Sequence, residues 1–484
     1  MNPLALIPLI VWWAVSPGAD YVRGMALARQ GRWTEARAAF QAGAAKAPRD
    51  KRFPLELAGV AYRLGSRESA RAYLRRALAL DPADGYGNEF LGTIYFLDGN
   101  LEAALKYWNR ARRPRIEAVR WEPEPRLKGE LADRALVFAP SEILLLEDYR
   151  ATQKRLDFLG IFSRSTIGLS ARQDNTFDVI VRAPERRASW LSFVRGLPFE
   201  TVYAELPDIR GSGVNLASMF RWDANKRRVQ AGVAFPLARD PGWRLRMGFN
   251  ARDENWSVPG AGDFRLRKAE ASLDLAHATG TGTEWSAGFT ASSRSVAVSR
   301  DGFALEARAS LRRDLLRIPE RRFVLSGVAS GALGRMFEGD AALFGKSEAG
   351  IEAVWRALRA RLRTGALAGG APFDQVFMLG AGRDTELWLR GHPAVRNGKN
   401  GSGPLGREFA LANIDWQPVL WRAGFFTLGA GPFLDAGRAW RGPAQSRWLA
   451  DPGMQATARL AAGPAVSVSW SRRTIFISVS PLNW

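Results

Sequence analysis

The stretch FTLGAGPFLDAGRAW, residues 426–440, decides the fold of this chain. Its even-numbered positions are apolar up to residue 436 and its odd-numbered positions are mostly small or polar, with Phe433 as the exception. Alternation with a period of two is typical of a strand with one apolar face. The less apolar face carries one carboxylate, Asp435, and an upstream segment, LRGHP at residues 389–393, supplies an isolated Arg390. The two motifs together predict a buried contact between Arg390 and Asp435 inside a barrel.

The same alternation continues through residues 188–484 and favours an antiparallel barrel with an apolar outside and a charged lumen. A soluble sandwich also alternates, but its strands are usually shorter than the segments of about ten residues expected here. Residues 352–362 fit either a strand or an amphipathic helix. The alternation predicts lipid-facing Leu245, Met247, Phe249, Leu273, Leu275, Leu428 and Leu434, and lumen-facing Arg244, Arg246, Asp274 and Asp435.

Bulk composition narrows the class of protein. The 484 residues carry a net charge of +21, but the arginines are dispersed along the chain, which argues against a nucleic-acid surface. A mean hydropathy of −0.18 excludes a bundle of membrane helices. With no Cys and two His, disulfide and thiolate chemistry are excluded, and a His-based metal site or triad is disfavoured. No catalytic constellation occurs, so we expect a protein that is not an enzyme and needs no metal or cofactor.

The first residues have the length and polarity of a targeting segment. LALIPLIVWWAV at residues 4–15 is followed by the small-residue stretch SPGA, although Lys and Arg are missing before it. We expect residues 1–19 to be a signal peptide; an uncleaved or interfacial anchor is the alternative.

An internal repeat follows at an interval of 34 residues, which is the tetratricopeptide spacing. It is marked by Gly31, Gly65 and Gly99, by Ala36, Ala70 and Ala104, and by Pro48 and Pro82. Residues 20–114 are therefore expected to form three tetratricopeptide repeats, in which the small residues let paired helices cross closely. The alternative is an ordinary amphipathic bundle.

Residues 115–187 show a strand-helix-helix-strand-strand pattern. Strands are expected at residues 116–121, 164–172 and 177–182, and helices at residues 125–138 and 145–162. This segment resembles a POTRA (polypeptide-transport-associated) domain, on the strength of its helix, its LGIF corner at residues 159–162 and its final pair of strands. A generic small α+β domain is the alternative.

With a POTRA-like module before it, the barrel resembles the superfamily of outer-membrane protein assembly factors and two-partner-secretion transporters. In that family a loop with an (V/I)RG(F/Y) tip enters the lumen and meets an F-x-D-x-G strand. The matching residues are Leu389, Arg390, Gly391 and His392 for the loop, with the outer two departing, and Phe433, Asp435 and Gly437 for the strand. The resemblance implies about 16 strands and a C-terminal assembly signal at Phe476, Leu482 and Trp484, which Ser478 and Ser480 interrupt.

The resemblance implies a place in the bacterial outer membrane, with the repeats and the POTRA-like domain in the periplasm. The expected function is an insertase or assembly factor that receives an unfolded outer-membrane or secreted protein. Its expected partners are that substrate, the lipid bilayer and a periplasmic protein bound by the repeats, but no nucleic acid. Two alternatives remain open: a two-partner-secretion transporter with one dedicated substrate, and a repeat scaffold on a passive porin.

Overall fold

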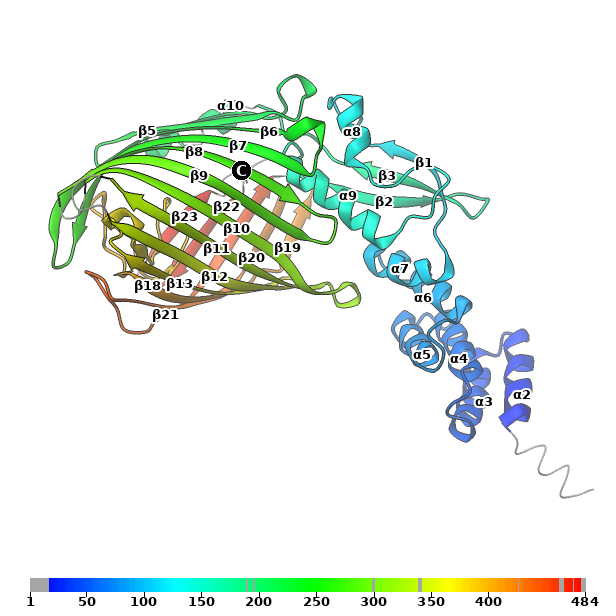
Figure 1. Ribbon diagram of the computed structural model, residues 1–484. Coiled ribbons are helices and arrows are strands. Elements are labelled where there is room, and N and C mark those ends of the chain that lie inside the picture. Colours follow the sequence, from blue (N-terminus) through cyan, green and yellow to red (C-terminus); the bar gives the residue numbers. More distant parts are fainter. Residues whose placement is uncertain are drawn as a thin grey trace, which may run out of the picture. The chain divides into compact units, whose positions relative to one another are not determined.

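The computed structural model describes residues 17–188, 190–194, 196–297, 301–337, 342–424, 426–460, 465–472 and 474–479 (Figure 1). The chain divides into two compact units. One comprises Met1–Ala118, Ala139–Leu146 and Ser170–Asp178, and the other comprises Val119–Phe138, Glu147–Leu169 and Val179–Trp484. The residues expected to form a signal peptide lie outside the described part of the chain, apart from the last three.

Six helices form three hairpins at the start of the first unit: α2 (Pro17–Arg29), α3 (Trp33–Lys46), α4 (Arg52–Arg63), α5 (Arg67–Leu80), α6 (Gly85–Leu97) and α7 (Leu101–Trp108). Gly31, Gly65 and Gly99 each lie two residues beyond the first helix of a hairpin, at φ of +75°, +80° and +66°. The backbone N–H after each glycine donates to a carbonyl five residues earlier, as in a Schellman motif. The three glycines are therefore structurally equivalent.

The repeated glycines and alanines have different roles. A Cβ at Gly31, Gly65 or Gly99 would meet nothing within 4 Å, so these glycines are needed for their positive φ and not, as expected, for close helix crossing. Ala36, Ala70 and Ala104 are fully buried, each in the first turn of the second helix of a hairpin. Close packing of the paired helices therefore depends on the alanines.

A small mixed sheet follows, with strands in the order β1-β3-β2. Its strands are β1 (Ile116–Trp121), β2 (Thr166–Ala171) and β3 (Phe177–Arg182), and its helices are α8 (Gly129–Ala135) and α9 (Leu146–Leu159). Both helices are shorter than the sequence pattern predicts. Helix α8 is confined by extended backbone at Lys128 and Leu136, and α9 stops before Gly160, whose φ is +67°.

The remaining strands close into an antiparallel barrel (Figure 1). They are β4 (Thr201–Leu206), β5 (Asn215–Asp223), β6 (Lys226–Pro236), β7 (Trp243–Val258), β8 (Gly262–Ala278), β9 (Thr283–Val296), β10 (Gly302–Ile318), β11 (Phe323–Met336), β12 (Leu343–Trp355), β13 (Leu358–Gly369), β18 (Glu408–Trp416), β19 (Val419–Ala423), β20 (Phe426–Trp440), β21 (Leu449–Leu460), β22 (Ala465–Ser471) and β23 (Ile475–Val479). These strands make about 16 in the described wall, as predicted, with β18 and β19 both paired to β20. Helix α10 (Trp190–Val194) precedes β4, and several 3₁₀ turns lie between later strands.

The two faces of the wall carry different side chains. Of the residues predicted to face outward, Met247, Phe249, Leu273 and Leu434 are exposed, and Leu245, Leu275 and Leu428 are half-buried. Of those predicted to face the lumen, Arg244 and Asp435 are buried, and Arg246 and Asp274 are half-buried. The predicted strand register is therefore consistent with the structure.

Two details of the wall differ from the sequence-based expectation. Residues 352–362 are neither one strand nor a helix, but a β12–β13 hairpin that turns at Arg356, where φ is +54°. Several strands are also longer than the ten residues expected, up to 17 in β8 and β10. Part of the extra length encloses an apolar cluster inside the barrel, to which Trp256, Val258 and Phe264 contribute.

One long connection, residues 370–407 between β13 and β18, is called the lumen loop below. It contains four two-residue strands: β14 (Phe377–Met378), β15 (Val395–Arg396), β16 (Lys399–Asn400) and β17 (Leu405–Gly406). Strand β16 pairs with β7, and β14 pairs with β17. Among the described residues, no helix combines the length and the apolar character needed to cross a bilayer.

Candidate functional site

The lumen loop folds back into the barrel, as the sequence predicts, and its side chains contact wall residues that face inward. Leu379 and Leu389 of the loop are fully buried in an apolar cluster with Leu411 and Phe409 of β18. The charged contacts of the loop are made to two different parts of the wall. The first part is β18–β21 and the second is β5–β9.

Arg390 is the centre of the contact with β18–β21. It is 3% exposed, and its guanidinium donates to both oxygens of Asp435, at 2.8 Å from Nε and 2.6 Å from Nη2. Its Nη1 donates to Asp415 at 2.6 Å and to Gln455 at 2.5 Å. Asn413 donates to Asp435 at 2.7 Å, so the fully buried carboxylate has several donors. A bidentate charge-assisted pair of this kind fixes orientation as well as distance.

Phe433 breaks the apolar alternation of β20 because it lies under this arginine. The Arg390 Cζ is 3.7 Å from the centre of the Phe433 ring, the arrangement of a cation–π contact. The ring therefore faces the lumen with Asp435, and the exception in the sequence pattern is part of the site.

The next two residues of the loop meet a second carboxylate, Asp451 of β21. The backbone N–H of Gly391 donates to Asp451 at 2.8 Å, and His392 Nδ1 lies 2.9 Å from the same oxygen. A Cβ on Gly391 would be 2.3 Å from the Asp451 carboxyl carbon, so glycine is required for close approach. Gly391 is not among the glycines with positive φ, so the close approach, and not the backbone conformation, accounts for a glycine here.

The outer positions of the two motifs pack against apolar groups. Leu389 lies in the buried cluster described above. A Cβ on Gly437 would be 3.0 Å from Leu411 and 3.3 Å from Leu379, so this glycine leaves room for the loop against the wall. His277, the other histidine, ends β8 and stacks on Trp243 with ring centres 4.2 Å apart.

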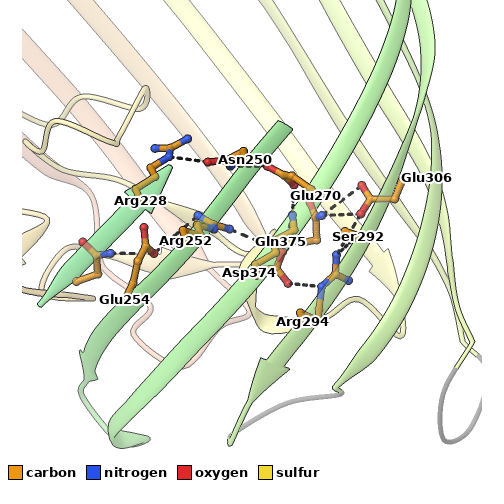
Figure 2. Close-up of polar contacts among 12 residues, drawn as sticks. Arg228, Asn250, Arg252, Glu254, Glu270, Ser292, Arg294, Glu306, Asp374 and Gln375 are labelled. Atoms are coloured by element: carbon orange, nitrogen blue, oxygen red, sulfur yellow. Dashed lines mark hydrogen bonds and ion pairs between the residues drawn. The ribbon is translucent and has the colours of Figure 1, made fainter. Parts of the chain in front are cut away.

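Asp374 makes the first contact with the opposite wall, β5–β9 (Figure 2). Its side chain is fully buried and lies 3.1 Å from Lys268 Nζ, 3.3 Å from Arg294 Nε and 3.9 Å from Arg252. These three cations come from β8, β9 and β7. Next to Asp374, Gln375 donates to Glu306 at 3.1 Å.

Asp384 makes the second contact with that wall. Its carboxylate accepts from Arg221 at 2.7 Å and from Arg228 at 3.3 Å, and Lys226 Nζ lies 3.6 Å away. Arg221 and Lys226 are themselves buried. Two aspartates of the loop are therefore held by six cations from five neighbouring strands.

The lumen wall thus has a basic part and an acidic part. The basic wall is defined as Arg221, Lys226, Arg228, Arg252, Lys268 and Arg294, and the acidic wall as Asp415, Asp435 and Asp451. The loop presents carboxylates to the first and a guanidinium to the second. The described residues contain no group of three side chains suited to a metal ion. The chemistry of the site is ionic attachment of a loop.

Of the residues expected to form the C-terminal assembly signal, only Phe476 lies in the described part of the chain. In β23 the exposed side chains are Ile475 and Ile477, whereas Phe476 lies against Trp388 of the loop, with ring centres 5.9 Å apart. Leu482 and Trp484 lie outside the described residues.

Sequence reasoning identified Arg390 and Asp435 but gave no role to Asp374 or Asp384. Asp384 lies six residues before Arg390, in the segment GAGRDTELWLRGHP. Its position close to the motif arginine was the one feature of the sequence that could have indicated a role for Asp384. For Asp374 no local signal exists, because its partners are spread over β7, β8 and β9.

Comparison with known proteins identifies the repeats. The tetratricopeptide repeat family matches residues 13–51, 21–85 and 55–117. None of the curated proteins matches the chain. Two similar solved structures are the second and first tetratricopeptide domains of Spaghetti (RPAP3) bound to an HSP90 peptide, at 19% and 23% identity, TM-scores of 0.19 and 0.20, and 20% of this chain covered in each case. They are covered over 89% and 76% of their own lengths.

A third similar structure is BamA from Haemophilus ducreyi lacking POTRA domains 1–3. It is 12% identical to this chain at a TM-score of 0.41, and the match covers 76% of this chain and 83% of that one. The family match covers the N-terminal repeats, and the structure itself shows the small mixed sheet and the large closed antiparallel barrel that follow.

Proposed function

We propose that this protein is an outer-membrane assembly factor, which receives unfolded protein in the periplasm and inserts it through, or along, its barrel. The observation that carries the proposal is the lumen loop, which is attached to both charged walls of the barrel. The resemblance of Leu389–His392 and of Phe433, Asp435 and Gly437 to the motifs of the assembly-factor superfamily supports it. The function includes no catalytic step, metal or cofactor.

The outer face of the barrel supports a place in a membrane. Leu333, Leu343 and Phe289 are 74%, 72% and 67% exposed, and outward positions on most other strands are also apolar. A soluble protein rarely exposes so many large apolar side chains over one surface. A lipid bilayer would cover them, as in outer-membrane barrels with alternating strands.

The buried ion pairs of the lumen loop support a role in holding the loop in one conformation inside the barrel. Ion pairs inside proteins contribute little net stability, because desolvation offsets the attraction between the charges. Their better-attested use is to specify one arrangement and to resist others. A loop attached to both walls obstructs passive diffusion through the lumen, so this feature favours a gated barrel over the porin alternative.

The junction between the first and last barrel strands is a candidate exit through which the substrate could leave the barrel for the bilayer. Strands β4 and β23, the first and last strands of the described wall, are neighbours there. We propose that the wall opens between these two strands and that an incoming strand pairs with the freed edges by backbone hydrogen bonds.

The periplasmic parts would deliver the substrate. In the small sheet, β1 and β2 are the outer strands, and an unfolded segment can add to such an edge by backbone hydrogen bonds. The tetratricopeptide repeats would bind a periplasmic protein or a further segment of the substrate.

Secretion of one dedicated substrate through the lumen is the second candidate. It is favoured by a lumen cavity of about 550 Å³ that remains beside the folded loop. In that case the loop would leave the lumen during transport, and the substrate would not enter the bilayer.

The test compares substrate assembly by Arg390→Ala, Asp435→Ala and the double variant at matched barrel levels. We expect each single variant to lose most activity and the double variant to lose little more, because each change breaks the same contact. Arg265→Ala and Asp253→Ala, which break an exposed pair on β8 and β7, are the matched controls. Losses at Arg390 and Asp435 that simply add would contradict the proposal.

A further inference from the structure

Two cavities beside the lumen loop are lined by arginines. The first, of about 550 Å³, is bordered by Arg228, Arg244, Arg246 and Arg308 among others. The second, of about 360 Å³, is bordered by Arg359, Arg361, Arg363 and Arg459 among others. Glu386 of the loop borders both cavities, so they adjoin the same part of the loop.

Some of these arginines have buried donors without an acceptor. Arg244 is 3% exposed, and within the described residues its Nε makes no hydrogen bond, although Nη1 donates to the Phe158 carbonyl at 2.7 Å. The Nε atoms of Arg246 and Arg363 are likewise buried without an acceptor in the described chain. A buried N–H that lacks a partner is costly, which favours an anionic ligand at this place.

Some of the arginines that border the cavities already pair with a carboxylate. Asp274 pairs with Arg308. Glu352 is shared by Arg312, Arg359 and Arg361, at 2.9, 3.3 and 3.1 Å. One carboxylate among three guanidinium groups leaves an excess of positive charge around strands β10, β12 and β13.

We propose that these cavities form a binding site for an acidic segment of unfolded polypeptide, rich in Asp and Glu. The inference rests on the proposed function and gives it a substrate class. Guanidinium groups suit carboxylates because the planar fork matches two oxygens. The site would retain a segment that carries several carboxylates and would repel a basic one.

The distribution of the arginines favours an extended chain over a single small anion. They come from β6, β7 and β10 in the first cavity and from β13 and β21 in the second. Gly232, Gly248 and Ser272 line the first cavity and leave room for a backbone. A single phosphate could reach only one of these groups of arginines at a time.

The test measures binding of a fluorescent Glu-rich peptide to the full chain, purified in detergent micelles, by fluorescence anisotropy. Gln-rich and Lys-rich peptides of equal length and inorganic phosphate are the competitors. We expect Arg246→Gln/Arg363→Gln to bind the Glu-rich peptide about tenfold more weakly or worse, because two charge-assisted contacts are lost. Arg37→Gln/Arg76→Gln, which removes the same charge from exposed helix positions, should bind like the wild type.

Arg246→Lys/Arg363→Lys separates charge from folding, because it keeps both charges and should restore part of the affinity. Equal affinity of the Gln variant and the wild type would overturn the inference. Displacement of the peptide by phosphate as effectively as by free Glu-rich peptide, at equal charge concentration, would also overturn it, since the site would then be a simple anion site.

This assay needs no assembly activity, so its outcome is separable from that of the proposed function. Arginine-dependent peptide binding, together with full assembly activity of Arg390→Ala and Asp435→Ala, would keep the site and refute the gated loop. Loss of assembly in those two variants, together with peptide binding that does not depend on the arginines, would keep the gated loop and refute the peptide-binding site.

Discussion

The two charged walls of the lumen differ in how they hold the same loop. On the acidic wall one guanidinium, Arg390, meets carboxylates from two strands, Asp415 of β18 and Asp435 of β20, and the pair with Asp435 is bidentate. On the basic wall two carboxylates, Asp374 and Asp384, meet cations from five strands without a comparable fork. The acidic wall therefore fixes the orientation of the Arg390 side chain, and the basic wall attracts the two loop aspartates over a larger area.

Opposite signs on the two walls also give the loop one orientation. A loop reversed across the lumen would bring Arg390 to the arginines of β5–β9 and the aspartates to the acidic wall. Like charges held close together in a site with little water strongly disfavour that arrangement. The comparison predicts that both walls are needed to hold the loop in the lumen. It also predicts that breaking the contacts of one wall lowers the free energy of unfolding by a different amount from breaking those of the other.

Asp374→Ala should have the largest effect on stability. It removes one partner from each of three cations of the basic wall, two of them buried: Arg252, Lys268 and Arg294. Their remaining carboxylate partners in the described chain are those of the wall: Glu254, Glu270 and Glu306. Removal of one partner from a buried ionic group costs about 3–5 kcal/mol. Denaturant unfolding of the purified barrel in micelles would measure this, with Asp253→Ala as the exposed control. A cost equal to that of the control would show that the basic wall does not hold the loop.

Arg390→Ala should cost somewhat less, about 3 kcal/mol. The buried Asp435 keeps Asn413 and the backbone N–H of residue 390 as donors, and Asp415 is partly exposed, so water can solvate its charge. Arg390→Lys should recover only part of that loss, since a lysine cannot make the bidentate contact with Asp435. The same unfolding experiment compares the two variants. Full recovery by lysine would mean that charge alone matters at the acidic wall.

Gly391→Ala tests the close approach to the acidic wall. The added Cβ would lie 2.3 Å from the Asp451 carboxyl carbon, so the loop or β21 must shift. Overpacking of this kind costs about 1–3 kcal/mol. Gly331→Ala on β11 is the matched control, because its Cβ would meet only the Lys346 carbonyl, at 3.7 Å. Equal unfolding midpoints for both variants would contradict the close contact.

Arg265→Ala should have the smallest effect. Its partner Asp253 is also partly exposed, and exposed ion pairs contribute about 0–1 kcal/mol. A loss in this variant as large as that in Arg390→Ala would remove the distinction between lumen pairs and outer pairs. Unfolding curves at low and high salt would measure the difference.

The sequence predicted the acidic side of this comparison better than the basic side. Alternation around Asp435 and an isolated Arg390 gave the strand register and the contact, because both residues lie in short recognisable motifs. The cations around Asp374 come from β7, β8 and β9, and none stands in a local motif. They meet only when the barrel curves, which depends on the pairing of whole strands. Phe433 illustrates the same limit, since its inward position is explained only by Arg390 above it.

The most direct test of the account measures how fast a thiol reagent labels a single cysteine placed at Leu379. This loop residue is fully buried, and it lies in the sequence between the two attachment points Asp374 and Arg390. The chain has no cysteine, so a thiol reagent would report on Leu379→Cys alone. We predict labelling of this variant at least about tenfold slower than that of Thr281→Cys, an exposed turn position. Adding Arg390→Gln or Asp374→Asn should accelerate the labelling of Leu379→Cys. Labelling as fast as at Thr281→Cys, or a rate that neither anchor variant changes, would contradict a loop held in the lumen by its two charged walls.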